Sequence, residues 1–193
     1  MMDTNDILTL IIAGLALFVS CVTYWDSNHN FKLDTTVGKD AMLSRITVDG
    51  AIVPLIKMNI CFINNGGKTD SIEDVKLKVE ISGAGIQSYK HEFLSAREFT
   101  DIFVDSAPST EILPIVVNGK SNTVKRYGFR AFPNMTQAMV PAIFNIKITL
   151  YAKMQGSWQK QKSFQTTDVT GVWNDFDNRM TTNSIIIALE KVN

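Results

Sequence analysis

Few side chains in this sequence are of the types that carry out acid–base or metal chemistry. The chain contains two histidines, His29 and His91, and neither has a cysteine or another histidine at a spacing typical of metal ligands. Residues 119–121 (GKS) match the end of a phosphate-binding loop, but Pro114 stands where that loop requires glycine. We therefore predict no catalytic site, no cofactor and no metal, and we assign residues 119–121 to a hairpin turn.

One strand-like segment combines basic and aromatic side chains. Residues 125–132 (KRYGFRAF) interleave the two kinds, and on a β-sheet such rings and guanidinium groups stack single-stranded bases. The segment predicts a site for an anionic ligand, either a nucleotide or a short single-stranded oligonucleotide. Its candidate residues are Lys120, Lys125, Arg126, Tyr127, Phe129 and Arg130. An ordinary strand with aromatic residues inward and arginines outward has the same pattern and is the simpler interpretation.

The segments that would position these residues are predominantly β. Beyond a polar linker at residues 26–30, β-branched and aromatic residues recur between turn signals throughout residues 31–193. Residues 89–97 are expected to form a short helix. The expected strands are 31–37, 45–48, 52–63, 75–81, 99–104, 112–117, 123–132, 143–153, 158–166 and 184–191. Many short strands and few helices predict one all-β domain, an antiparallel β-sandwich of the immunoglobulin-like type or a small barrel.

Strict alternation supports two of these strands. Residues 75–81 (VKLKVEI) and 146–150 (IKITL) alternate apolar with polar side chains, as in antiparallel sheets with one solvated face. Residues 154–157 (MQGS) predict a hairpin turn, and residues 64–67 (NNGG) predict the end of another strand.

An apolar segment near the N-terminus predicts a membrane-spanning helix at residues 7–25, preceded by a polar tail at residues 1–6. Residues 7–24 carry no charge, and at about 1.5 Å per residue they cover about 27 Å, close to the hydrocarbon thickness of a bilayer. Tyr24 and Trp25 follow, where an interfacial aromatic belt would lie. A cleaved signal peptide normally begins with positive charge, whereas no lysine or arginine precedes Lys32. We therefore predict an uncleaved anchor.

The charges on the two flanks of this helix predict its orientation. Asp3 and Asp6 precede the helix, whereas Lys32, Lys39 and Arg45 follow it. Positively charged flanks tend to remain in the cytoplasm, so the β-domain is expected there. The part of the chain after the helix has a single cysteine, so it cannot form an internal disulfide, which agrees with a reducing compartment.

One face of the predicted helix carries small and hydroxyl-bearing side chains. At about 100° per residue they form a narrow stripe, which consists of Thr9, Ala13, Ala16, Ser20 and Thr23 and is extended outward by Asp6. Small residues let helix backbones approach, and hydroxyl groups can hydrogen-bond across helices, so the stripe predicts a homo-oligomer. A ring of Asp6 carboxylates would then lie at the mouth of a cation-conducting pore. The alternative is that small residues are simply common in membrane helices.

Residues 59–79 (NICFINNGGKTDSIEDVKLKV) resemble the strand–turn–strand of many bacterial immunoglobulin-like sandwiches, in which an N-x-G turn precedes an I-x-D-V-x-L-x-V strand. With its N-terminal helix, the chain is similar to small bacterial inner-membrane proteins with one transmembrane helix and such a sandwich. These include membrane effectors of anti-phage defence systems. The resemblance implies location in a bacterial inner membrane, and it implies no functional residues.

Three classes of function remain. The first is a non-enzymatic oligomeric effector whose cytoplasmic domain senses a ligand or partner protein while its helices assemble to permeabilise the membrane, as in anti-phage defence. The second is a monomeric, membrane-anchored protein-interaction module, and the third is an enzyme. Lysine plus arginine equals aspartate plus glutamate at 19 each, so no net charge draws the protein to nucleic acid. We favour the first class narrowly over the second, and both over an enzyme.

Overall fold

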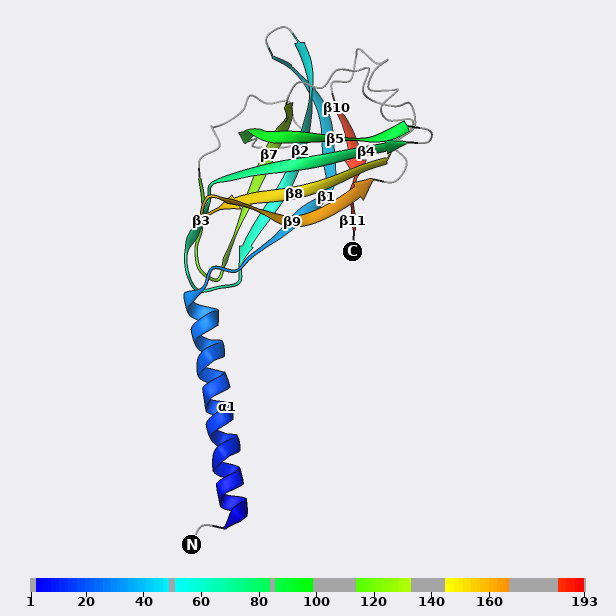
Figure 1. Cartoon of the computed structure of the whole chain (residues 1–193). Helices are drawn as coiled ribbons and strands as arrows, with labels where there is room; N and C mark the ends of the chain where they lie inside the picture. Colours follow the sequence, from blue (N-terminus) through cyan, green and yellow to red (C-terminus); the bar gives the residue numbers. More distant parts are fainter. Residues whose placement is uncertain are drawn as a thin grey trace.

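A computed structural model of the chain describes residues 3–48, 51–83, 86–98, 114–132, 145–166 and 184–192. In this part of the chain one helix, α1 (Thr4–His29), projects from a β-domain (Figure 1). The strands are β1 (Leu33–Val48), β2 (Ala51–Asn64), β3 (Asp70–Ile72), β4 (Asp74–Gly83), β5 (Ile86–Glu98), β6 (Ile115–Val117), β7 (Ser121–Phe132), β8 (Asn145–Met154), β9 (Ser157–Thr166), β10 (Ser184–Ala188) and β11 (Glu190–Lys191). The strand expected at residues 99–104 lies outside the described residues.

Nine strands form one large antiparallel sheet, which is nearly closed into a barrel. Their order is β10-β1-β2-β7-β5-β4-β8-β9-β11, while β3 and β6 pair in a small second sheet. The C-terminal segment joins the two ends, because β10 pairs with β1 and β11 pairs with β9. The prediction of an all-β antiparallel fold is confirmed, in its barrel-like form.

One hydrogen bond and one ion pair reinforce this joint between the two ends of the sheet, which we call the seam. The amide of Leu189 donates to the carbonyl of Lys39 at 2.7 Å. From β9 to β1, the ammonium of Lys162 lies 2.8 Å from a carboxylate oxygen of Asp34. The seam therefore depends on contacts between the two ends of the β-domain sequence, which no local pattern encodes.

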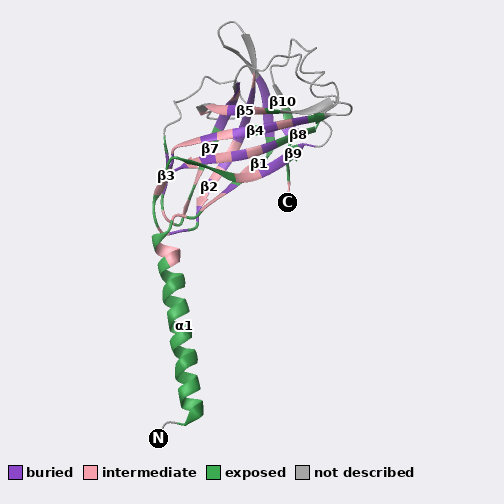
Figure 2. Ribbon diagram, viewed as in Figure 1, coloured by how far each residue is buried: buried purple, intermediate pink, exposed green. Residues whose placement is uncertain are grey.

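Buried residues, purple in Figure 2, recur along the strands of the β-domain. The apolar ones among them form one hydrophobic core. The alternation predicted in β4 and β8 is confirmed, and the buried residues of these strands include Val75, Leu77, Val79, Ile81, Ile146, Ile148 and Leu150. The aromatic side chains of Phe62, Phe93 and Phe129 pack in the same core. The interior is thus a packed core of the kind found in small barrels.

The short helix expected at residues 89–97 is wrong, because this segment lies within β5. Strand β5 pairs on one side with β4 and on the other with β7, and Phe93 lies opposite both Leu77 and Ala131. Pairing with β4 and β7 supplies hydrogen-bond partners for the backbone groups along both edges of this strand. This tertiary pairing overrides a weak local preference for helix.

The two predicted turns have different outcomes. The hairpin at residues 154–157 is confirmed: it joins β8 to β9, and Gln155 and Gly156 have φ of 49° and 76°. Both values lie in the left-handed region, as a tight hairpin turn requires. Residues 119 and 120 also make a turn directly before β7, but the hairpin assignment to residues 119–121 is wrong. Strand β6 before the turn belongs to the small sheet and β7 after it to the large one.

Helix α1 is longer than its apolar segment. It begins with a capping box, in which Asp3 caps the N-terminus and Asp6 accepts from the Asp3 amide at 3.2 Å. At the other end it continues through most of the expected linker at residues 26–30, where Trp25 and His29 stack with ring centroids 3.9 Å apart. Asn30 is the C-cap, and β1 begins three residues later.

We expect acid to destabilise the β-domain. The hydrogen bond from Lys162 holds the pKa of Asp34 below its usual range, and Lys76 does the same for the pKa of Glu92. Because these pKa values are lower in the folded chain, their stabilising contribution is present above about pH 4 and is lost as the pH falls through the folded-state values. Urea unfolding at a series of pH values should show a decline confined to this acidic range.

The matched variant is Lys162→Gln, which removes the ammonium group that is bonded to Asp34. It should flatten part of the acid dependence of the free energy of unfolding, because the pKa of Asp34 then returns toward its usual value. A pH dependence identical in the two proteins would contradict a role for this pair.

Candidate functional site

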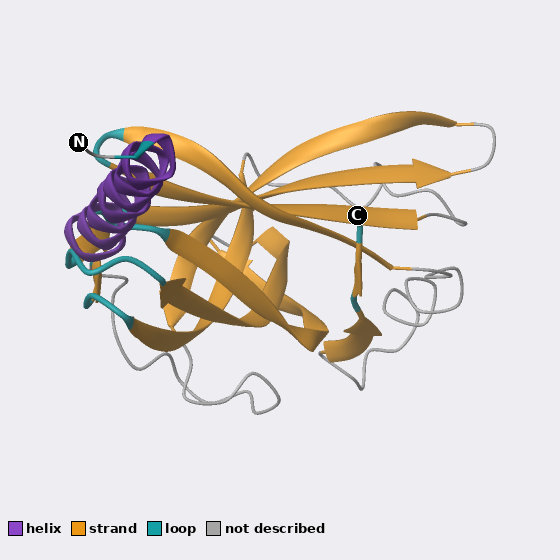
Figure 3. Ribbon diagram, turned by 90° about the horizontal axis from the view of Figure 1, so that it is seen from below, coloured by secondary structure: helices purple, strands orange, loops and turns teal. Residues whose placement is uncertain are grey.

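The most organised polar region of the described chain is the connection between α1 and the barrel. It brings together the end of the helix, the start of β1, the turn after β2 and the turn before β7. Figure 3, seen from below, shows α1 beneath one end of the β-domain, with loops beside it. We call this region the junction and define it as Asp26, Asn28, Asn30, Lys32, Asn64, Gly66, Gly67, Lys68, Gly119 and Lys120.

The side chain of Asn64 is the centre of the junction. It is 1% exposed, and its Oδ1 accepts from the amides of Lys32 at 3.2 Å and Gly66 at 2.9 Å. Its Nδ2 donates to the carbonyls of Lys68 at 2.7 Å, Val117 at 3.4 Å and Asn118 at 3.1 Å. One buried amide therefore joins the chain just after α1 to both neighbouring turns.

Three glycines allow the backbones of these segments to touch. A Cβ atom at Gly66 would collide with the carbonyl oxygen of Asn30, and one at Gly67 would collide with the backbone of Asn28. A Cβ atom at Gly119 would likewise strike the Gly67 carbonyl. Only glycine permits so close an approach.

Backbone hydrogen bonds cross the same contacts. The amide of Lys68 donates to the Asn30 carbonyl at 3.3 Å, and the amide of Lys120 donates to the Gly66 carbonyl at 2.8 Å. The ammonium of Lys120 also donates to Oδ1 of Asn28, in the last turn of α1, at 2.6 Å. Because these contacts fix backbone to backbone, the junction sets the direction in which the helix leaves the barrel.

In the structure, the aromatic and the basic residues of the predicted anionic-ligand strand lie in different environments. Tyr127 and Phe129 are 1% and 0% exposed and meet edge to face inside the barrel, and burial raises the pKa of Tyr127. Lys125 pairs with Glu98 at 3.0 Å. The rings are therefore not beside the basic groups on the surface, which matches the alternative of an ordinary strand. Arg126 is exposed, Arg130 is half-buried and Lys120 lies in the junction, so a ligand prediction rests on these basic residues alone.

The residues of the predicted helix stripe are exposed, like the other residues of α1 up to Trp25. The hydroxyls of Thr9, Ser20 and Thr23 each donate to the carbonyl four residues earlier, at 2.8 Å. These hydroxyl groups therefore already donate hydrogen bonds within their own helix, and the Asp6 carboxylate already accepts one in the capping box. The side chains of Ala13 and Ala16, in the middle of the stripe, are small and still permit a neighbouring helix to pack closely.

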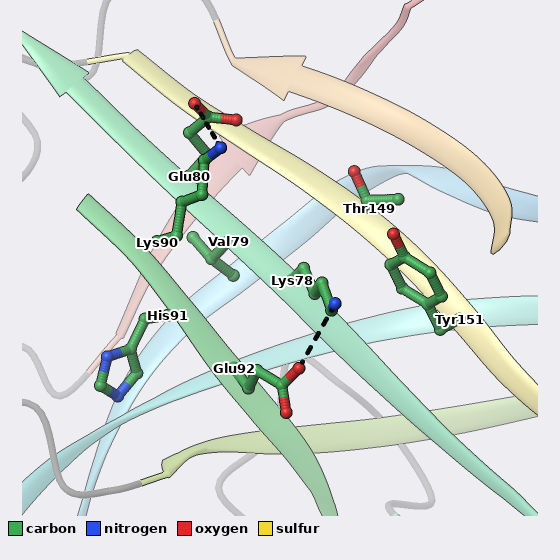
Figure 4. A pocket seen from close by; sticks show the side chains of 8 residues that line it. All are labelled: Lys78, Val79, Glu80, Lys90, His91, Glu92, Thr149 and Tyr151. Atoms are coloured by element: carbon green, nitrogen blue, oxygen red, sulfur yellow. Dashed lines mark ion pairs between the residues drawn. The ribbon is translucent and has the colours of Figure 1, made fainter. Parts of the chain in front are cut away.

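A shallow hollow of about 300 Å³ lies on the outer face of β4, β5 and β8 (Figure 4). Its charges are paired, with Lys78 3.6 Å from Glu92 and Lys90 3.8 Å from Glu80. Lys78 also lies 5.1 Å from the centre of the Tyr151 ring. The hollow therefore offers balanced charge, as at the polar rim of a protein interface, and one aromatic side chain of a type enriched at interfaces.

Sequence reasoning missed the junction as a site. The NNGG run predicts only the end of a strand, and its two consecutive glycines are the sequence signal for a close backbone approach. Among the described residues, no group of three or more His, Cys, Asp or Glu side chains could hold a metal. Helix α1 is long and apolar enough to cross a membrane. No protein-family model, no curated protein and no solved structure matches this chain.

Proposed function

We propose that this protein is a non-enzymatic, membrane-anchored interaction module. In this proposal α1 spans the membrane, and the junction holds the barrel at a fixed height and direction on its surface, where the barrel binds a partner protein. The observation that carries the proposal is that a helix with exposed apolar side chains is joined to a packed barrel by backbone contacts rather than by a flexible linker. The bacterial inner membrane, with the barrel in the cytoplasm, is the setting we propose for it.

The exposure of α1 supports a membrane rather than water as its surroundings. Leu10 and Phe18 are 68% and 66% exposed, and large apolar side chains surround the helix. Apolar surface in water costs about 25 cal/mol per Å², so an isolated helix of this composition needs an apolar environment. A bilayer supplies that environment over the same length.

The nearly closed sheet favours binding through a face of the barrel. The end strands of the large sheet, β10 and β11, span only Ser184–Ala188 and Glu190–Lys191. A partner that adds a strand would find little free edge in the described part of the chain. The outer face of β4, β5 and β8, with its hollow and paired charges, offers such a binding face.

A second candidate is the oligomeric effector that perturbs the membrane. It is favoured by the small side chains of Ala13 and Ala16 in the middle of the helix stripe. It is placed second because the hydroxyls and Asp6, which would bind or line a neighbouring helix, already have partners within α1. A role in anti-phage defence belongs to this candidate.

The mass of the full-length protein in mild detergent, corrected for bound detergent, separates the two candidates. The module is expected to be a monomer. A defined oligomer that Ala16→Leu dissociates, and that Val22→Leu on the opposite face leaves intact, would favour the effector. Recovery of the protein in the soluble fraction after alkaline carbonate extraction of membranes would overturn both, because each requires a spanning helix.

A further inference from the structure

We propose that the junction is also a binding surface for the anionic phospholipid headgroups of the membrane that α1 enters. The contacting groups are the ammonium groups of Lys32, Lys68 and Lys120. The inference goes beyond anchoring by a helix, and it rests on the part of the proposed function in which α1 spans the membrane.

The length of the helix places these lysines at headgroup level. Tyr24 and Trp25 are 70% and 65% exposed, and such residues lie at the boundary between hydrocarbon and headgroups. From Trp25 to His29 the helix rises about 6 Å, and the headgroup layer on each side of a bilayer is about 5–7 Å thick. Because the junction follows the helix without a flexible linker, its lysines are held in or just above that layer.

The charge of the junction is positive. The junction has three lysines and one aspartate, Asp26, which pairs with Lys32. The carboxylate of Asp70 also interacts electrostatically with Lys68, so three lysines face two carboxylates. Lys32 nevertheless keeps 44% of its side chain exposed. Lys68 and Lys120 are exposed, and the side-chain bond of Lys120 goes to the neutral amide of Asn28. The junction therefore has ammonium charge available to a phosphate.

The outer hollow provides a contrast within the same protein. There Lys78 and Lys90 face Glu92 and Glu80, so the lysine charges are balanced by carboxylates. Lysine binds phosphate as a compact point charge, and lysines near an anionic membrane surface are attracted to its headgroups. The uneven distribution of charge thus favours the membrane-proximal end of the barrel, rather than its outer face, as the surface that binds lipid headgroups.

The test is hydrogen exchange on the full-length protein in nanodiscs of phosphatidylcholine alone or mixed with phosphatidylglycerol. Backbone amides of residues 65–69 and 118–121 are expected to exchange several-fold more slowly with phosphatidylglycerol present. At about 1 M salt, where the Debye length is about 3 Å, this difference should disappear. Inorganic phosphate added to phosphatidylcholine nanodiscs should not reproduce it, because the lipid and not free phosphate is the ligand.

Two variants and a control make the test specific. Lys68→Glu should remove most of the lipid-dependent slowing, and Lys68→Glu with Lys120→Gln should remove all of it. Lys90→Glu, at a side chain 75% exposed on the outer face, should retain it. Equal exchange in the two lipids for the native protein, or an equal loss in the Lys90→Glu control, would overturn the proposal. Protein that leaves the nanodiscs altogether would instead overturn the membrane anchor.

Discussion

Asn64→Ala is expected to lower the free energy of unfolding by about 3 kcal/mol, since backbone groups left without partners in a buried site cost about 1–3 kcal/mol each. The variant removes the acceptor of two amides and the donor to three carbonyls, and the site is 1% exposed. Water entering the vacated space would recover part of this loss. Urea unfolding of the full-length protein in mild detergent, followed by tryptophan fluorescence, gives the value.

The neighbouring residue provides the control for this prediction. Asn65 is exposed, so Asn65→Ala should change the free energy of unfolding by no more than about 0.5 kcal/mol. Asn64→Asp keeps an oxygen acceptor but loses the Nδ2 donor and places a carboxylate against the same carbonyls, so it should be at least as destabilising as alanine. An Asn64→Ala protein as stable as the control would contradict the central role of this side chain.

Gly66→Ala is expected to cost about 2–3 kcal/mol and to loosen the helix relative to the barrel. Its Cβ would collide with the carbonyl of Asn30, which belongs to the backbone and cannot turn away as a flexible side chain would. The collision separates the turn after β2 from the end of α1, and the backbone bonds across the junction weaken with it. Unfolding in urea measures the stability change.

The two native cysteines report the loosening directly. Cys21 is exposed on α1 and Cys61 is half-exposed on β2, so spin labels at these positions measure the distance between helix and barrel. The native protein should give a narrow distance distribution and Gly66→Ala a broad one. Gly38→Ala is the control, because its Cβ would meet its nearest atom at an ordinary 3.5 Å. Equally narrow distributions in all three proteins would show that the glycine contact does not set the helix direction.

Local sequence patterns were sufficient for several elements. The apolar segment, the alternation in β4 and β8, and the turn at residues 154–157 all follow from side-chain periodicity and from residues that tolerate positive φ. Each of these signals lies within one short segment, so it can be interpreted without the rest of the chain. The inner and outer faces of β4 were predicted correctly for the same reason.

Where the signal was ambiguous, pairing with distant strands decided the outcome. Residues 89–97 form part of β5 because they pair with β4 on one side and with β7 on the other. The aromatic residues of β7 are equally compatible with a binding surface and with a core. Their burial is fixed by the register of β7 against β2, in which Tyr127 lies opposite Met58 and Phe129 opposite Ile56, both buried.

Local side-chain patterns are enough to predict an apolar helix of membrane-spanning length, an antiparallel β-domain and the alternating faces of its clearest strands. How the barrel closes and how the helix is attached to it depend instead on contacts between distant segments. Closure joins β1 to the C-terminal segment, and the junction brings Gly66 and Gly119 against backbone that lies far away in sequence. Such contacts depend on loop closure and register over long separations, whereas periodicity reports only on neighbouring residues.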